Sequence, residues 1–416
     1  MNENNNQVKE VVKENTEFKM IIEKDSFKDA LRKVNNCAGK YANDKHFDLA
    51  KMTSDEQNVN LYVYDGECYL RILISDAKVM GNNISCAFEP KLLLSALNGL
   101  RKGKIELVID DNTISITEKV GKTTKNVRHV SLPVLSGDQV VEGNLQKNEN
   151  NHLITKPMQF SKFIDCFRRA TICSSSDESM PIIQGVHMLV MGEQLYLEST
   201  DRHLACRLIT EFDSDSIACV DSENNAISGD NSEFNEFTLI IKSNYFSKMN
   251  KIFNDDDIVL AEIYDNGIRV ISNSEKSCTF ATTSLTGSFP KMDHFFEVEM
   301  AEAQVTCSYS ALKEAVTTFT RTTQLNKGTE VVLIFNKNNL TLKTIANAEI
   351  QYSLDLEISS NLEETKICVS SAYLSNILDC LNTSELSLLI KQANAPIYFW
   401  GSKNDCALLT PMLIKE

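Results

Sequence analysis

The chain has 416 residues, of which 42% are hydrophobic and 24% are charged, and its formal net charge at pH 7 is −15. This length exceeds what one hydrophobic core usually organises, so two to four domains are expected. The acidic balance excludes a surface that coats nucleic acid everywhere, although it leaves room for a local basic lining.

The first seventeen residues, through Glu17, are rich in Asn, Glu, Lys and Val. They lack the apolar core and the small-residue cleavage site of a secretory signal, so we predict a disordered tail at residues 1–17. No apolar run elsewhere approaches the roughly 18 residues that a membrane helix needs. We therefore expect a cytoplasmic protein.

A pattern of one helix followed by one hairpin begins after the tail and occurs three times. Its apolar spacing changes from the helical period to strict alternation, which is typical of a helix leading into antiparallel strands. The helical segments are residues 27–34, 160–171 and 309–319. The hairpins are residues 60–70, 187–197 and 332–342.

A second pattern follows the first in every copy. A short apolar strand runs into an amphipathic helix, at residues 87–97, 240–249 and 368–378. A polar turn and an alternating strand come next, at residues 105–109, 258–263 and 386–390. The fold class predicted from these elements is α+β, with three repeated domains that each pack two helices on antiparallel sheet.

Polar stretches near residues 142–151 and 296–303 separate the copies. The predicted domains are residues 18–145, 150–298 and 299–416. An acidic insertion at residues 213–235 interrupts the second domain. Its Asp213-Ser214-Asp215 lacks the spaced ligands and the terminal Glu of a calcium loop, so we predict a solvated loop there.

The residues that usually carry catalysis or metals lack the necessary spacing. Twelve cysteines lie singly between Cys37 and Cys406 without any C-x-x-C pair, which predicts reduced structural thiols. The six histidines show no H-E-x-x-H spacing, and no G-x-S-x-G turn accompanies Asp201 and His203. Residues 99–104 are basic but do not form a P-loop. We predict no metal, no cofactor and no enzymatic activity.

Several stretches resemble motifs of the bacterial β sliding clamp, the processivity factor of DNA polymerase III. They are residues 180–186 (MPIIQGV), 199–205 (STDRHLA), 287–290 (GSFP) and 408–413 (LLTPML). The resemblance covers essentially the whole chain after the tail. Residues 43–47 replace a Pro-Ile-Leu stretch, and no Arg follows His203. These departures indicate a divergent member, such as a phage or mobile element would encode.

This resemblance implies a homodimer that closes a ring around double-stranded DNA without reading its sequence. It also implies that a hydrophobic peptide-binding pocket tethers the replicative DNA polymerase and the clamp loader, so that the protein acts in DNA replication. Two alternatives are a clamp-fold binding scaffold that has lost ring formation and a cryptic hydrolase.

A clamp needs a basic inner lining because retention comes from enclosure and not from tight phosphate contacts. Six helical segments of the repeats together carry a formal charge of +12, so the rest of the chain carries −27. The predicted DNA-channel residues are Lys28, Arg32, Lys33, Arg101, Lys102, Arg168, Arg169, Lys248, Lys251 and Arg321.

The resemblance also places a partner-peptide pocket and a dimer interface. The pocket residues are Ile183, Thr200, His203, Leu204, Pro290, Phe295, Tyr373, Ala393, Pro396, Thr410, Pro411 and Met412. Met, Pro and aliphatic side chains suit an extended peptide with apolar anchors. The interface residues are Phe319 and Thr320, which are expected to face the strand with Ile114 and Ile116 of another chain.

Overall fold

The computed structural model describes most of the chain. The described residues are 17–39, 45–55, 57–110, 112–119, 127–143, 152–191, 194–211, 217–218, 237–272, 277–297, 304–324, 330–345, 353–381, 383–401 and 405–413. The predicted disordered tail, apart from Glu17, and nearly all of the predicted acidic insertion lie outside them. No helix among these residues is both long enough and apolar enough to span a membrane.

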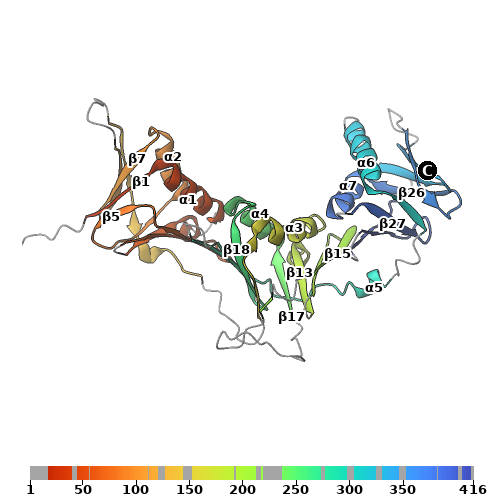
Figure 1. The fold of residues 1–416 in the computed structure, drawn as a ribbon, viewed down its shortest axis with the longest axis horizontal. Coiled ribbons are helices and arrows are strands. Elements are labelled where there is room, and N and C mark those ends of the chain that lie inside the picture. The colour runs from red at the N-terminus through yellow and green to blue at the C-terminus, as the bar shows by residue number, and fades with distance from the viewer. Residues whose placement is uncertain are drawn as a thin grey trace, which may run out of the picture. The chain divides into compact units, whose positions relative to one another are not determined.

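The described residues form an α+β fold in which helices pack on antiparallel sheets, as predicted from the sequence (Figure 1). The chain divides into two compact units. Unit 1 is Met1–Asn144 with Ile271–Phe280, and unit 2 is Leu145–Val270 with Ala281–Glu416. The second and third copies of the repeat therefore share unit 2.

Unit 1 contains helices α1 (Lys24–Cys37) and α2 (Pro90–Asn98), which contact each other. One of its sheets has the order β5-β1-β7-β8-β9, and a second run has the order β10-β6-β2-β3-β4. The strands are β1 (Phe18–Glu23), β2 (Ala50–Ser54), β3 (Val59–Tyr64), β4 (Cys68–Ile74), β5 (Lys78–Gly81), β6 (Ser85–Phe88), β7 (Lys104–Ile109), β8 (Thr113–Glu118), β9 (His129–Pro133) and β10 (Leu135–Ser136).

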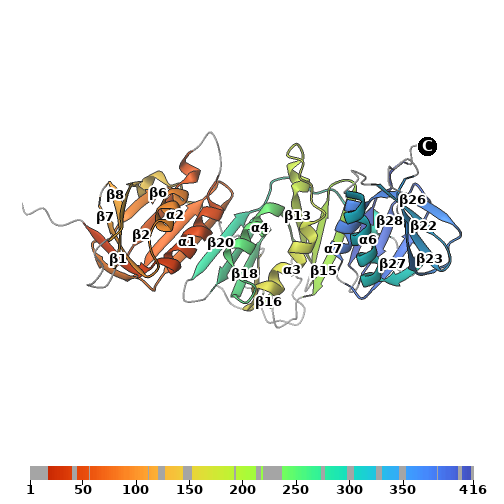
Figure 2. The same ribbon diagram turned by 90° about the horizontal axis from the view of Figure 1, so that it is seen from above.

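Unit 2 contains two contacting helix pairs, α3 (Phe160–Thr171) with α4 (Ser243–Ile252) and α6 (Tyr309–Gln324) with α7 (Ser371–Cys380). These four helices lie on one side of the sheets of unit 2, and the short helix α5 (Asp293–Phe296) lies on the other (Figure 1). Seen from above, α3 and α7 are neighbours, and the two helices are in contact (Figure 2).

The strands of unit 2 form three groups. A nine-stranded sheet has the order β17-β13-β14-β15-β29-β28-β27-β21-β25, a four-stranded sheet has the order β24-β23-β22-β26, and a further run has the order β19-β18-β11-β16, with β12 also paired to β18. Parts of β19 and β20 belong to unit 1. The strands are β11 (His152–Thr155), β12 (Met158–Gln159), β13 (Gly185–Met191), β14 (Gln194–Thr200), β15 (Leu204–Glu211), β16 (Ile217–Ala218), β17 (Phe237–Lys242), β18 (Ile258–Tyr264), β19 (Gly267–Ser272), β20 (Cys278–Thr283), β21 (Val305–Ser308), β22 (Glu330–Phe335), β23 (Asn339–Lys343), β24 (Ser353–Glu357), β25 (Ser359–Ser360), β26 (Thr365–Ser370), β27 (Glu385–Ile390), β28 (Ile397–Trp400) and β29 (Cys406–Leu409).

The helices form because their apolar residues recur on one face. In α3, the buried residues Phe160, Phe163, Phe167 and Ala170 follow the i, i+3, i+7 spacing of a helix that packs on a core. The ring of Phe167 stacks on that of Phe246 from α4, with the ring centroids 4.7 Å apart. Burying one such aromatic side chain stabilises the fold by about 1.5–3 kcal/mol, so this face determines where α3 docks.

Antiparallel pairing of β15 with β29 joins the second and third copies of the repeat. The paired residues run from Leu204 with Leu409 to Arg207 with Cys406. We call this pairing, together with the side chains that cross it, the seam. Within the seam, Nη1 of Arg169 lies 2.8 Å from Oδ2 of Asp405, whose side chain is only 6% exposed. The same carboxylate accepts a hydrogen bond from the backbone N–H of Ile209 at 2.9 Å.

The substitution Asp405→Ala should lower the free energy of unfolding by about 3 kcal/mol, because it leaves the Arg169 charge without its buried partner. Denaturation in urea would measure the change. Asp255→Ala is the matched control, since it removes the exposed partner of Arg168 and should cost less than about 1 kcal/mol. Equal losses in the two variants would contradict a structural role for the Arg169–Asp405 pair.

Candidate functional site

A tight turn between β14 and β15 presents His203 at one end of the seam. The carboxylate of Asp201 accepts hydrogen bonds from the backbone N–H groups of His203, at 2.8 Å, and Leu204, at 2.9 Å. The Thr200 hydroxyl donates to the Leu204 carbonyl at 2.8 Å. Arg202 has a φ of 81°, in the left-handed region that non-glycine residues rarely adopt. These bonds hold the turn in one conformation while His203 remains exposed.

The segment after β29 is fixed to this turn and to a second strand. Both the backbone N–H and the hydroxyl of Thr410 donate to the His203 carbonyl at 2.9 Å. The N–H of Met412 donates to the Cys368 carbonyl of β26 at 2.7 Å. Met412 nevertheless keeps 39% of its surface exposed, and Leu413 keeps 89%. Hydrogen bonds therefore fix the backbone of this segment, while the side chains of Met412 and Leu413 face solvent.

Tyr373 from the first turns of α7 completes this surface. Its ring stacks on that of His203, with the centroids 5.7 Å apart and the planes 21° apart. Burial, followed by the negative charge of Asp201, raises the pKa of Tyr373. We call His203, Tyr373, Thr410, Pro411 and Met412 the apolar platform. These five predicted pocket residues come from three distant segments and meet at the seam.

The other predicted pocket residues occupy three different places. Ile183, Thr200 and Leu204 are buried, and the bond from the Thr200 hydroxyl to the Leu204 carbonyl belongs to the turn that carries His203. Pro396 precedes Ile397, which pairs with Leu409, and Ala393 is exposed in the preceding turn. Pro290 and the 39% exposed Phe295 belong to the segment around α5, which lies on the side of the sheet opposite to α7 (Figure 1).

The segment around α5 contributes contacts that sequence reasoning missed. Met292 packs with Ala205 and Leu408 across the seam. Arg207 bonds Asp293 at 2.6 Å, and the Phe289 ring stacks on His187. The only hint in the sequence is the apolar Phe289-Pro290 pair beside Met292, so this contact had to come from the three-dimensional structure.

The predicted DNA-channel residues fall into exposed and paired groups. Arg32, Arg101, Lys102, Lys251 and Arg321 are exposed. Lys28 is half-buried, Lys33 lies 3.5 Å from Asp29, Arg168 bonds Asp255 and Asn250, and Lys248 lies over the Tyr245 ring. Arg169 differs from all of these. Its guanidinium is directed to the buried Asp405, so the prediction that Arg169 contacts DNA is revised to a structural role at the seam.

The predicted dimer-interface residues are also revised. Ile114 and Ile116 are 0% exposed, and their strand β8 is hydrogen-bonded to β7 and β9, so it has no free edge. Phe319 and Thr320 are buried as well, at 1% and 8%. All four side chains already pack within their own chain and cannot cover a partner.

Two end strands of the sheets present the edges that an interface would need. β9 ends its sheet in unit 1, and β24 ends the four-stranded sheet in unit 2. Both alternate exposed and half-buried residues along their whole length. The alternation of polar and apolar residues in HVSLP and SLDLE is the sequence signal that could have identified them.

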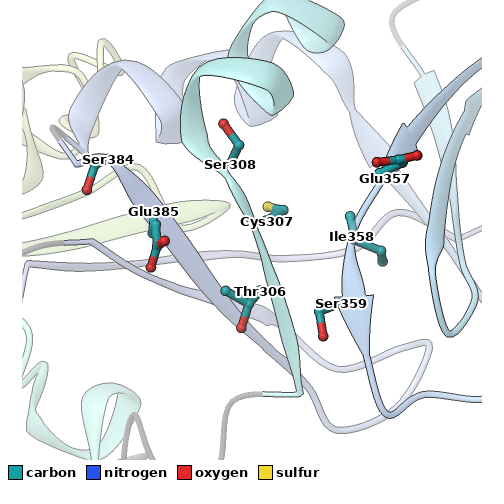
Figure 3. Close-up of a pocket in the computed structure, with 8 residues that line it drawn as sticks. All are labelled: Thr306, Cys307, Ser308, Glu357, Ile358, Ser359, Ser384 and Glu385. Atoms are coloured by element: carbon teal, nitrogen blue, oxygen red, sulfur yellow. The ribbon is translucent and has the colours of Figure 1, made fainter.

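A cavity of about 550 Å³ opens elsewhere in unit 2, between the start of α6 and the strands below it (Figure 3). Its lining residues are Thr306, Cys307, Ser308, Glu357, Ile358, Ser359, Ser384 and Glu385. Figure 3 shows Glu357 and Glu385 on strands to either side of Cys307. The lining contains no basic residue and none of the predicted pocket residues, so it suits neither a phosphate nor the expected peptide.

Comparisons with known proteins identify the fold. In sequence, no protein-family model and no curated protein matches the chain. In structure, the β subunit from the DNA polymerase of Streptococcus pyogenes is similar, with a TM-score of 0.77 and 17% identity over 95% of this chain and 99% of that one. The Helicobacter pylori β clamp bound to a DNA ligase peptide has a TM-score of 0.75 at 16% identity, over 95% and 100%.

The DNA polymerase sliding clamp from Bacillus subtilis gives a third match, with a TM-score of 0.77 and 15% identity over 96% of this chain and all of that one, at 100%. The coverage includes both units, and it leaves no large part of either chain unmatched. The chain therefore has the fold of the bacterial sliding clamps, as the sequence motifs indicated.

The turn that carries His203 should depend on Asp201. Asp201→Ala removes the acceptor of two backbone hydrogen bonds and should lower the free energy of unfolding by about 1–2 kcal/mol. Hydrogen exchange should accelerate at the amides of His203 and Leu204. Asp110→Ala is the control, because Asp110 accepts the same pair of bonds from Asn112 and Thr113 in another turn. Unchanged exchange at His203 and Leu204 in Asp201→Ala would contradict the described turn.

Proposed function

We propose that the protein is a DNA sliding clamp that encircles duplex DNA as a homodimer and tethers a replicative polymerase for processive synthesis. The observation that carries this proposal is the apolar platform, which is partly exposed, held by hydrogen bonds and positioned at the seam of a clamp fold. The three sequence repeats correspond in this proposal to three clamp domains, residues 18–145, 150–298 and 299–416. The clamp loader is the second partner.

Peptide binding at the apolar platform follows from its chemistry. Met412 offers a flexible and polarisable side chain, and the stacked rings of His203 and Tyr373 offer a flat apolar surface. An extended partner segment with one or two apolar anchors would bury these groups without rearranging the backbone. The Helicobacter pylori clamp binds a DNA ligase peptide, which supports assigning a peptide to this fold.

Duplex DNA would be held by weak, general electrostatic attraction. The exposed basic residues lie on or beside helices, whereas the chain as a whole has a formal net charge of −15. Each phosphate that a basic residue neutralises makes binding more dependent on salt, so few contacts favour sliding over tight binding. Retention then depends on the closed ring and not on the strength of any contact.

Ring closure is assigned to the edges of β9 and β24. A contact between β9 of one chain and β24 of another is heterologous, and two such contacts close a dimer. Pairing would satisfy backbone groups that each edge strand otherwise leaves to water. β24 exposes Asp355 and Glu357, whereas β9 exposes His129 and Ser131, so the two edges do not repel each other.

We propose a binding role for the protein and expect no catalytic one. The alternative is a clamp-fold scaffold that has lost ring formation, in keeping with the absence of an Arg after His203 and the altered residues 43–47. A monomer at micromolar concentration in light scattering would favour that alternative. We also propose that the protein acts in the cytoplasm, because bacterial DNA is replicated there.

Peptide binding at the apolar platform should weaken when the Met412 side chain is truncated. Met412→Ala combined with removal of residues 413–416 should weaken the binding of a polymerase-derived peptide at least about tenfold, which corresponds to about 1.4 kcal/mol. Fluorescence anisotropy would measure the affinity. Met180→Ala is the control, because Met180 is equally exposed, at 39%, but lies outside the apolar platform. Unchanged peptide affinity in the Met412 variant would exclude this surface as the peptide site.

The stability of the dimer contact that closes the ring should depend on the charge of the exposed side chains of β9. Ser131→Asp would place a third carboxylate against Asp355 and Glu357 of the partner chain and should weaken the dimer at least about tenfold, or 1.4 kcal/mol. Sedimentation equilibrium would measure the dissociation constant. Loaded Ser131→Asp protein should also leave closed circular DNA sooner than the wild type.

Ser131→Lys is the matched variant for this experiment. It adds a charge at the same position but should leave the dimer intact or strengthen it. Binding to linear duplex should be weak and salt-sensitive for all three proteins, because an open end lets a ring slide off. If Ser131→Asp and Ser131→Lys change the dimer equally, β24 is not the facing strand.

A further inference from the structure

Three cysteine thiols meet in the interior of unit 2, beside the seam. The Sγ atoms of Cys173, Cys206 and Cys380 all lie within 4.8 Å of one another, and all three residues are buried. Cys173 follows α3, Cys206 lies on β15, and Cys380 is the last residue of α7. Among the described His, Cys, Asp and Glu residues, no other group of three brings its ligand atoms together in this way.

The three sulfurs lie close enough together to bind one ion between them. A thiophilic cation would occupy the space among these sulfurs, since thiolates are its preferred ligands.

The surroundings provide an oxygen atom and a positive charge. Oγ of Ser199 lies 3.3 Å from Sγ of Cys206 and 2.5 Å from the carbonyl oxygen of Ala170. The Arg169 guanidinium donates to the Cys380 carbonyl at 3.2 Å. The same guanidinium is paired with Asp405, so its bond to the carbonyl fixes the Cys380 backbone beside the three sulfurs.

Simple packing explains one buried cysteine but not this convergence. A single buried thiol behaves as a small hydrophobe, as Cys37 does at the end of α1. Three sulfurs from three separate segments, all within reach of one ion, supply three of the four ligands of a structural zinc site. The segments are the residues directly after α3 and strand β15, from the second repeat, and helix α7, from the third.

We propose that Cys173, Cys206 and Cys380 form a structural site for a thiophilic divalent ion of the zinc class, with the Ser199 hydroxyl beside Cys206. Binding replaces up to three thiol protons, which leave to solvent, and no electron is transferred. The resulting complex of one divalent ion and three thiolates carries one negative charge. The ion would cross-link α7 to α3 and β15, and so strengthen the seam below the apolar platform.

Cadmium(II) tests this site because its bonds to thiolates absorb in the ultraviolet. It would be added to the reduced, full-length protein, both folded and during refolding, because the cluster is buried. We expect one equivalent to bind with the absorption of three thiolate bonds, and Zn(II) to displace it. Cys173→Ser and Cys380→Ser should each weaken Cd(II) binding at least about tenfold. Cys37→Ser, which changes a buried cysteine of α1, should bind as the wild type does.

Several results would overturn the site. They are the absence of stoichiometric Cd(II) binding, an equal loss in Cys37→Ser, or full binding in Cys173→Ser. If the Ser variants do not fold by circular dichroism, X-ray absorption of the Cd(II)-loaded wild type decides, and fewer than three sulfur ligands would refute the site. A disulfide within the cluster, in protein that takes up no Cd(II) when reduced, would also refute it. None of these measurements involves DNA or a partner peptide, so they are independent of the proposed function.

Discussion

The backbone pairing of β15 with β29 is the interaction on which the rest of unit 2 depends. Either strand alone would leave a row of unpaired N–H and C=O groups, and their pairing turns two small sheets into one sheet of nine strands. The turn at His203 leads into β15, and the segment with Thr410 leaves β29. Because the two strands are in register, they bring His203 together with the segment from Thr410 to Met412, and Tyr373 of α7 completes the apolar platform.

Local patterns predicted the elements well because helix and strand periods are properties of short segments. The predicted helix 160–171 coincides with α3, and the predicted segments 27–34 and 309–319 lie within α1 and α6. Contacts between separate elements were harder to predict. The alternation around Ile114 and Ile116 predicts a strand correctly, but nothing in it shows that the next strand, β9, covers its outer edge. The predicted interface residues therefore lie on a strand whose two edges are already paired within the chain.

Arg168 and Arg169 show why a count of charges cannot assign roles. They are consecutive on α3, so their side chains leave the helix about 100° apart. Arg168 reaches Asp255 at the surface, whereas Arg169 reaches Asp405, which lies 236 residues further along the chain. The sequence gives both the same formal charge. Only the packing of α3 against the seam distinguishes the solvent-facing Arg168 from Arg169, which is neutralised in the interior. The cluster of three thiols near Arg169 was missed for the same reason, because its members also meet only in the folded structure.

The wide separation in sequence across the seam has a consequence for how the protein is made. His203 and Thr410 are bonded to each other but lie 207 residues apart. After β15 has left the ribosome, nearly half of the chain must still be synthesised before β29 can pair with β15. Until then β15 is an open edge, exposed to wrong partners during a slow, long-range closing step. The apolar platform appears only after that step, so an incomplete chain cannot compete for the partners of a finished one.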